Sequence, residues 1–333
     1  MSSPACNVLK MTDPMTDPLI TEAGRSGEPL IHASSLTKTF GTFTAVNSID
    51  FSVARGESFG FLGPNGAGKS STMRMVGAVS PVTSGTLRIL GKDPAVEGPS
   101  IRSRLGVVPQ QDNLDLELSV WENLYLYGRY FGIPRKALNP KIEELLDFAQ
   151  LSDRAKDRVE PLSGGMKRRL TIARSLINDP EILLLDEPTT GLDPQARHVL
   201  WDRLYRLKNE GVTLVLTTHY MDEAEQLCDR LVVMDHGEIV AEGSPAELIR
   251  RHSSREVAEL RFQVGENEAG AEALRDIAER VEVLADRVLL YVTDGEAALR
   301  AVHDRDLKPI SSLVRRAGLE DVFLILTGRT LVD

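Results

Sequence analysis

Cysteine is scarce in this chain of 333 residues, which contains only Cys6 and Cys228. Two cysteines cannot build the disulfide framework of a small secreted protein, and we expect both thiols to be reduced, as in the cytosol. Cys228 lies in the segment AEQLCDRL, which favours a small buried apolar residue over a reactive thiol. We therefore do not expect cysteine chemistry to carry the function.

Long hydrophobic runs are lacking as well. A helix that crosses a bilayer needs about 20 predominantly apolar residues. The strongest runs here, around Leu183–Leu185 and Val212–Leu216, are much shorter and indicate buried strands. The first residues also lack the continuous apolar core of a signal peptide. We expect no membrane span and no secretion signal, and the length predicts about two domains.

An excess of positive charge is the third absence, because the formal net charge is −10. Proteins that coat nucleic acid usually carry a basic face, so we expect no nucleic-acid partner. With 42% hydrophobic and 26% charged residues, the chain is otherwise ordinary for a folded protein. Any specific function must therefore be found in local motifs.

The chain divides into three segments by composition. Residues 1–29 contain the tandem copy MTDPMTDP and few apolar residues, so we expect a disordered leader in which Met11 and Met15 are candidate first residues. Residues 30–250 are expected to form the first domain and residues 251–333 a smaller second one.

Strand-like and helix-like segments alternate in the first domain, a pattern typical of an α/β fold with a mostly parallel sheet. A helical insert is expected at about residues 115–165, where apolar residues recur at spacings of three and four. The other predicted elements are a strand at Ser58–Leu62, a helix from Lys69, a strand at Ile182–Leu185, a helix at Pro194–Asn209 and a strand at Thr213–Leu216.

The second domain shows a different pattern, which predicts a small α+β unit. We expect strands at residues 257–264 and Arg287–Val292 and helices at Ala269–Glu279 and Glu296–His303. An amphipathic segment, LEDVFLILTGR at residues 319–329, closes the chain.

A glycine-rich segment, GPNGAGKSS, follows the predicted strand Ser58–Leu62. It matches the phosphate-binding pattern G-x-x-x-x-G-K-[ST] between a strand and a helix, the context that the pattern requires. The glycines let successive backbone N–H groups point at phosphate oxygens, and the helix start adds favourable potential. Lys69 is predicted to reach the β- and γ-phosphates and Ser70 to bind Mg²⁺. The predicted nucleotide-binding residues are Gly63, Pro64, Asn65, Gly66, Ala67, Gly68, Lys69, Ser70 and Ser71.

A second motif, ILLLDEP, places two carboxylates at the end of the buried strand Ile182–Leu185. Asp186 is predicted beside the P-loop, where it can hold the Mg²⁺ shell. Glu187 is predicted to face the γ-phosphate and to deprotonate the attacking water, a role typically worth about 10²–10⁴-fold in rate. The alternative is that Glu187 only caps the following helix.

The segment LSGGM at Leu162–Met166 follows the P-loop and precedes ILLLDEP. In this order the motifs resemble the ATP-binding-cassette (ABC) ATPases, over roughly Leu30–Glu247. The resemblance implies a P-loop NTPase fold of the ABC type, in which LSGG of one copy binds the γ-phosphate held by the P-loop of another. It assigns Ser163, Gly164 and Gly165 to that contact. It also assigns Asp193 to the loop that crosses the dimer interface.

Three further roles are assigned through this resemblance. Phe40 stands where the family has an aromatic that stacks on adenine, with Phe43 as a competing candidate. Gln110 matches the glutamine that touches Mg²⁺ and the attacking water, and Gln111 is the alternative register. His219 follows a buried strand and is implied to contact the γ-phosphate. The implied catalytic residues are thus Glu187, His219 and Gln110, and the implied Mg²⁺ ligands are Ser70, Gln110 and Asp186.

Several segments resemble a narrower group, the ATPases of ABC-2-type exporters for nodulation factors and daunorubicin. These segments are VVPQQDNLDLELSVWENL, GRYFGI, TTHYMDEAEQLCDRL and the closing LEDVFLILTGR. The resemblance implies a homodimer that uses ATP and Mg²⁺ to energise a separate ABC-2 permease. It implies a peripheral subunit on the cytoplasmic side of the cell membrane. The cargo would be a drug, lipid or glycan-like molecule.

Other classes of ABC ATPase share the same cassette. Those of ribosome function usually carry two cassettes and a charged linker. Those of DNA repair insert long coiled coils between the P-loop and LSGG, where this chain has no sustained heptads. Those of iron–sulfur cluster assembly are not expected to carry LEDVFLILTGR. Export is the favoured prediction, and a soluble ABC ATPase of ribosome function or iron–sulfur assembly is the alternative.

Overall fold

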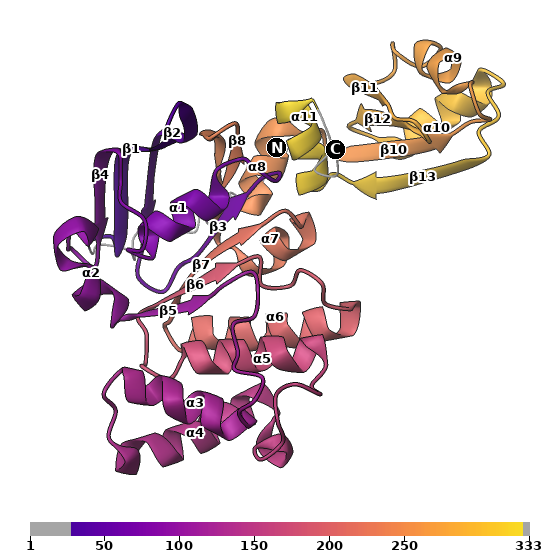
Figure 1. Cartoon of the computed structure of the whole chain (residues 1–333). Coiled ribbons are helices and arrows are strands. Elements are labelled where there is room, and N and C mark those ends of the chain that lie inside the picture. Colours follow the sequence, from indigo (N-terminus) through magenta and orange to yellow (C-terminus); the bar gives the residue numbers. More distant parts are fainter. Residues whose placement is uncertain (1–27, 329–333) are drawn as a thin grey trace, which may run out of the picture.

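The computed structural model describes residues 28–328. The predicted leader, residues 1–29, therefore lies outside the described residues except for its last two, and so do Cys6, Met11 and Met15. Over the described range the chain forms three β-sheets with helices around them (Figure 1). No helix in residues 28–328 is long and apolar enough to cross a membrane.

A six-stranded sheet lies at the centre, in the order β5-β6-β7-β3-β8-β9. All neighbouring strands are parallel except β8 and β9. Strands β3, β6 and β7 are buried almost throughout, which is the usual state of parallel strands covered on both faces. The bounds are β3 Ser58–Leu62, β5 Leu105–Val108, β6 Ile182–Asp186, β7 Thr213–Thr218, β8 Arg230–Asp235 and β9 Glu238–Gly243.

An antiparallel sheet in the order β2-β1-β4 packs beside it and closes a second part of the core. Its strands are β1 (Ile31–Phe40), β2 (Phe43–Val53) and β4 (Ser84–Ile89). Phe51 of β2 packs against Phe59 and Phe61 of β3, with ring centroids 6.0 Å and 5.1 Å apart. These aromatic contacts join the two sheets.

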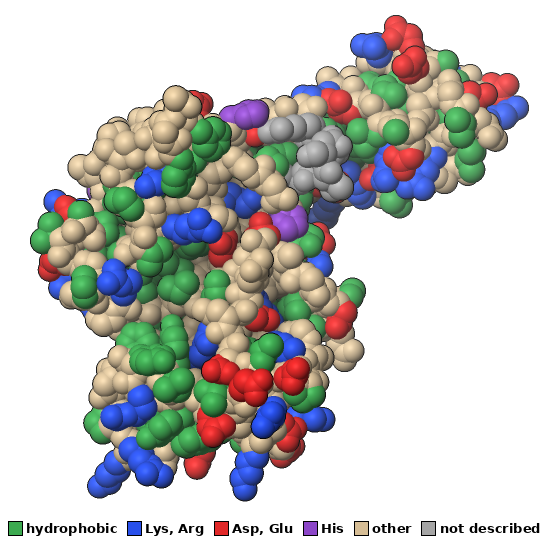
Figure 2. All heavy atoms as spheres, viewed as in Figure 1, with side chains coloured by type: hydrophobic (Ala, Val, Ile, Leu, Met, Phe, Trp, Pro, Cys, Tyr) green, Lys and Arg blue, Asp and Glu red, His purple; other side chains and the backbone are tan. Residues whose placement is uncertain are grey.

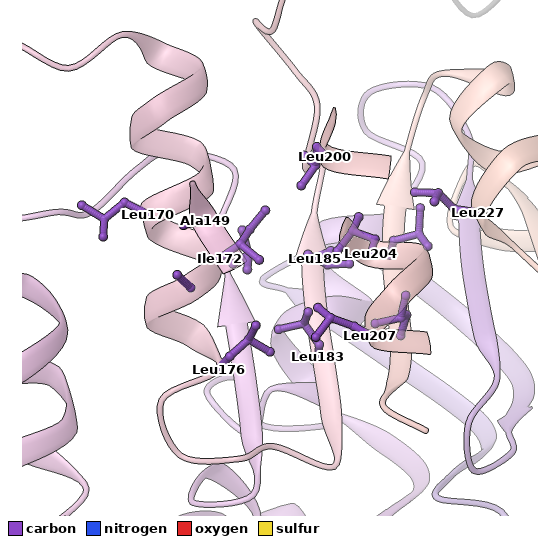
Figure 3. Packing of buried hydrophobic residues seen from close by; sticks show 14 of the residues in the cluster. Ala149, Leu170, Ile172, Leu176, Leu183, Leu185, Leu200, Leu204, Leu207 and Leu227 are labelled. Carbon is purple, nitrogen blue, oxygen red and sulfur yellow. The ribbon is translucent and has the colours of Figure 1, made fainter. Parts of the chain in front are cut away.

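Helices cover the central sheet on both sides. Figure 3 shows Leu183 and Leu185 of β6 beside Leu200, Leu204 and Leu207 of α6. Each buried leucine contributes about 1.5–3 kcal/mol relative to an exposed one. The helices of this part are α1 Lys69–Val76, α2 Pro94–Arg102, α5 Gly164–Ser175, α6 Pro194–Asn209, α7 Met221–Leu227 and α8 Pro245–His252.

The predicted helical insert forms α3 (Val120–Tyr130), α4 (Arg135–Ala149) and a short 3-10 turn at Ser152–Arg154. Ser119 and Glu122 start α3 with a capping box. Gly128 lets α3 approach α4 closely, because a Cβ there would lie 2.4 Å from Leu138 Cδ1. These helices form the lower part of the molecule in Figure 1.

The C-terminal part contains a four-stranded antiparallel sheet in the order β11-β12-β10-β13. It projects away from the helical insert in Figure 1. The final helix, α11, lies between this sheet and the rest of the chain. The bounds are β10 Glu256–Arg261, α9 Asn267–Glu272, β11 Arg280–Val283, β12 Val288–Val292, α10 Gly295–Asp304, β13 Ser311–Arg316 and α11 Leu319–Thr327.

Two predicted elements in this part are present but end earlier than expected. The strand expected at residues 257–264 ends at Arg261. The helix expected at Ala269–Glu279 is limited to α9. Gly270 packs directly on the Phe262 ring, and the backbone N–H of Glu279 already donates to Tyr291 O as the chain enters β11. Residues 273–279 therefore form turns and a bend that lead into β11 instead of continuing the helix.

Candidate functional site

The loop after β3 has the curled backbone that a P-loop needs. Gly66 and Gly68 have φ of +83° and +102°, values that residues with a side chain rarely adopt. A Cβ on Gly63 would lie 2.3 Å from Met234 O, and one on Gly68 would lie 2.5 Å from Ala45 O. Asn65 and Gly66 are exposed at the tip, whereas Ala67 is buried. The loop delivers the chain into α1 with its N-terminal amides free for an anion.

Lys69 is held against this loop. Its Nζ donates to Gly63 O at 2.6 Å and Pro64 O at 2.9 Å, and the residue is 4% exposed. Burial lowers the pKa of the Lys69 ammonium, while the carboxylates of Glu187 and Asp186 oppose that shift. The Nζ lies 4.0 Å from Glu187 Oε1. A positive group is therefore fixed between the loop and the end of β6.

Hydroxyl and carboxylate oxygens meet where β6 and β7 end. Ser70 Oγ donates to Asp186 Oδ1 at 3.2 Å, and Thr217 Oγ1 donates to the same oxygen at 2.5 Å. Magnesium is usually held by one or two carboxylates together with phosphate oxygens. The described residues contain no group of three or more His, Cys, Asp or Glu able to hold a metal. Ser70 and Asp186 offer one hydroxyl and one carboxylate, a donor set that suits a Mg²⁺ whose other ligands are phosphate oxygens.

Glu187 sits in a strained turn directly after β6. Its φ is +46°, a conformation that costs about 1–3 kcal/mol in a residue with a side chain. Its N–H donates to both the carbonyl and the hydroxyl of Thr217, each at 3.1 Å. Its Oε2 accepts from Gln110 Nε2 at 2.9 Å and Thr190 Oγ1 at 3.2 Å.

His219 Nδ1 approaches the other oxygen, Oε1, to 3.3 Å, without the alignment of a full hydrogen bond. His219 is the largest influence that lowers the pKa of the Glu187 carboxyl, helped by Lys69 and Thr190 and opposed by burial. The carboxylate is therefore ionised at neutral pH and can accept a proton from water. The alternative role as a helix cap is wrong, because Asp193 caps α6.

Between the two candidate glutamines, the structure brings only Gln110 to Glu187. Gln111 is exposed beside it. Phe40 and Phe43 pair across the turn between β1 and β2 and are 53% and 62% exposed, so neither ring belongs to the core. Both rings remain candidates for stacking on a base.

The other predicted residues form a second group. Ser163 caps α5 through Met166 N–H, and Asp193 caps α6 through Ala196 N–H. They share a surface hollow of about 280 Å³, which Gly165 also lines. Gly164 is open, since a Cβ there would meet nothing within 4 Å. Among the described residues, no hydrogen bond of Ser163 reaches the P-loop.

Sequence reasoning missed three residues that complete the first group, namely Thr190, Thr217 and Arg168. Thr217 follows from parallel pairing, because its register places it beside Asp186. Arg168 stands three residues after LSGG, but nothing local shows that its side chain reaches β6.

Comparisons with known proteins agree with this geometry. Residues 46–190 match the family described as ABC transporter, and residues 266–328 match "Nodulation factor export protein NodI, C-terminal domain". A protein of Ralstonia nicotianae, "Nod factor export ATP-binding protein I", is 46% identical over 315 residues, which cover 93% of this chain and 97% of that protein. The chain belongs to the Nod factor export ATP-binding protein I family of ABC transporter ATPases.

Other members of the Nod factor export family match over a similar length. The one from Rhizobium sp. (strain N33) is 47% identical over 301 residues, covering 90% of this chain and 98% of that protein. The predicted family is confirmed, and the chain is an ABC-type ATPase, the ATP-hydrolysing subunit of an ABC exporter. Nothing in the comparisons supports ribosome function or iron–sulfur assembly.

Solved structures confirm the predicted P-loop NTPase fold of the ABC type. A dimeric ATP-binding cassette in a post-hydrolysis state, bound to ADP and Pi, is 28% identical with a TM-score of 0.60, covering 64% of this chain and 98% of that one. The structure of cbiO1 from Clostridium perfringens, part of the ABC transporter complex cbiONQ, is 26% identical with a TM-score of 0.63, covering 68% of this chain and 92% of that one.

Proposed function

We propose that two copies of this chain enclose two Mg²⁺-ATP molecules between them and hydrolyse them to drive a separate permease. The observation that carries the proposal is the division of the predicted residues into two groups. The P-loop, Asp186 and Glu187 lie together, whereas Ser163, Gly165 and Asp193 line a different hollow. A second copy would bring its Ser163 hollow onto the P-loop of the first. The related cassette bound to ADP and Pi is itself a dimer.

Each residue then has a role that its contacts support. Lys69 and the P-loop amides bind the β- and γ-phosphates, with Asn65, Pro64, Ala67 and Ser71 shaping the loop. Ser70, Asp186 and Gln110 would hold Mg²⁺, which neutralises charge on the phosphates. Glu187 orients and deprotonates the attacking water. His219 contacts the γ-phosphate, and Phe40 stacks on adenine.

We further propose that the permease is of the ABC-2 type and binds beside Gln110. A hollow of about 450 Å³ there is lined by Met73, Arg74, Val79 and Val107. Val79 is 67% exposed and Val107 43%. In Figure 2, hydrophobic side chains are visible at the waist between the sheets and the helical insert. A bound permease would place the chain on the cytoplasmic face of the membrane.

The cargo is proposed from the relatives and from the sequence resemblance. The relatives are named Nod factor export ATP-binding protein I, so we propose a glycan- or lipid-like molecule of that kind as the exported substrate. A drug is the alternative that the resemblance to daunorubicin-resistance ATPases leaves open. Residues 30–250 would act as the nucleotide-binding domain and residues 251–333 as its accessory domain.

Glu187→Gln tests the catalytic proposal. Glutamine keeps the shape of the side chain and its contact with Gln110 but cannot take a proton, so turnover should fall by about 10²-fold or more. ATP binding should persist, so the variant should elute as an ATP-dependent dimer on size exclusion. Lys136→Ala, on the exposed side of α4, is the control. A monomer that turns over ATP at the wild-type rate would refute the proposal.

A further inference from the structure

Arg168 of α5 is a buried charge that points into the protein, with 4% of the residue exposed. Its Nε donates to Pro188 O at 2.7 Å. Its Nη2 donates to Asp186 O at 3.2 Å and to Glu187 O at 3.1 Å. One guanidinium therefore binds three consecutive carbonyls, from the last residue of β6 through the first two residues of the turn that follows.

The remaining nitrogen, Nη1, reaches a second segment. It donates to Pro109 O at 2.5 Å and lies 3.5 Å from Gln110 O and from Asp112 Oδ1. A guanidinium is planar and presents its donors in a rigid fork. It consequently fixes the separation between the backbone at Gln110 and the backbone at Glu187.

These two backbone segments carry the side-chain contact that matters for hydrolysis. Gln110 Nε2 donates to Glu187 Oε2 at 2.9 Å, and Glu187 has the left-handed φ of +46°. A residue with a side chain stays in that region only when its surroundings hold it there. Thr217 holds the N–H side of Glu187, and Arg168 holds its carbonyl side.

We propose that Arg168 is a positioning residue that keeps Glu187 and Gln110 in their hydrolytic arrangement. Because Arg168 belongs to α5, it also ties that arrangement to the helix whose N-cap and first two residues, Ser163–Gly165, would face the partner's nucleotide. A shift of α5 on dimer closure would thus be passed directly to Glu187. The inference rests on the proposed function of Glu187 in hydrolysis.

The competing explanation is that Arg168 only stabilises the fold, and Arg174 provides a matched control. Arg174 lies on the same helix and is 8% exposed. It donates to Asn113 O at 2.9 Å, bonds Asn113 Oδ1 and stacks on Tyr127 at 4.8 Å. Within residues 28–328, none of its hydrogen bonds or ion pairs reaches Glu187 or Gln110. Burial lowers the pKa of both guanidinium groups, with Asp112 opposing that shift in each.

The experiment compares Arg168→Lys and Arg168→Gln with Arg174→Lys in the full chain. Measured are kcat and KM for Mg²⁺-ATP, the affinity for a fluorescent ATP analogue, and the melting temperature. A misplacement of about 1 Å can cost about 10²-fold, so we expect kcat of Arg168→Lys to fall roughly 10- to 100-fold. ATP affinity should change by less than about threefold, so the loss of activity should be confined to kcat. Arg174→Lys should lower the melting temperature similarly and change kcat by less than about twofold.

The inference is overturned if Arg168→Lys keeps wild-type kcat, if ATP affinity falls in step with kcat, or if Arg174→Lys loses kcat equally. It is also overturned if both Arg168 variants fail to fold while Arg174→Lys folds, because that result shows a purely structural role. A wild type without Mg²⁺-ATPase activity, or normal turnover in Glu187→Gln, would instead count against the proposed function.

Discussion

Glu223 of α7 is fully buried, and neither of its carboxylate oxygens has a hydrogen-bond partner among the described residues. Burial is the main cause that raises the pKa of this carboxyl, opposed by Thr218, Thr189, Trp201 and Arg197. A carboxyl with a raised folded pKa contributes stability that is complete below its unfolded pKa. That stability is lost as pH rises through the folded pKa.

Glu223→Gln should therefore change stability in a pH-dependent way. Glutamine fills the same space without a charge, so at pH 8 the variant should equal or exceed the wild type by roughly 1 kcal/mol. At pH 5 that advantage should shrink or reverse. Thermal unfolding at the two pH values measures the difference, with Glu143→Gln on exposed α4 as control. A variant that is less stable at pH 8 than at pH 5, relative to wild type, would contradict this assignment.

At the scale of single residues, the sequence predicts those site residues that stand within a short contiguous motif. Lys69, Ser70, Asp186 and Glu187 lie where their motifs predict, because strand, loop and helix follow one another directly. Glu223 and Arg168 were not predicted. Their burial arises from packing between helices and strands that are distant in the chain, and no local pattern records that packing.

Helix α11 joins two hydrophobic clusters. Leu319, Val322 and Phe323 belong to the main core, while Leu324 packs with Tyr291 of β12. The start of α11 is held by a hydrogen bond to α7. Glu225 of α7 accepts from the Leu319 N–H at 2.7 Å. The sequence predicted an amphipathic segment here. The spacing of its apolar residues could not show that α11 packs into both hydrophobic clusters.

Phe323→Ala should be strongly destabilising, because Phe323 is 0% exposed in the main core. Truncation of a buried phenylalanine costs about 3–5 kcal/mol through lost burial and the cavity that remains. Leu313→Ala on β13, where Leu313 is 56% exposed, should cost less than about 0.5 kcal/mol. Urea unfolding measures both variants. Equal losses would mean that α11 does not brace the core.

Strands β11 and β13 were not predicted from the sequence, because each depends on pairing with another strand. The β13 segment, SSLVRR, is short and half polar, and it becomes a strand only by pairing along the length of β10. β-Propensity depends on the partner surface more than on the residues themselves. The parallel strands β3, β6 and β7 were predicted because they are continuously apolar.

At the scale of the whole molecule, the two groups of site residues face different hollows of one chain. Under the proposed function, a monomer would hold two half-sites rather than one site. The sequence led us to expect this through the family resemblance, which implies that the single P-loop and the single LSGG each supply part of the nucleotide's contacts. The sequence could not indicate where on the surface each group of site residues lies, because their positions depend on how α5 and α6 pack on the sheet.

Mixing two inactive variants tests this arrangement. Lys69→Ala removes the phosphate contact of one half-site. Gly164→Asp places a charge against the partner's γ-phosphate and meets open space within its own chain. Each homodimer should be inactive. In a twofold dimer, each mixed pair has one intact site and one doubly altered site. With random mixing, half of the dimers are mixed, so roughly a quarter of wild-type turnover should return.

ATPase assays across mixing ratios, with Lys136→Ala replacing either variant as control, measure the recovery. No recovery in dimers that demonstrably exchange subunits would show that the halves do not form composite sites as proposed.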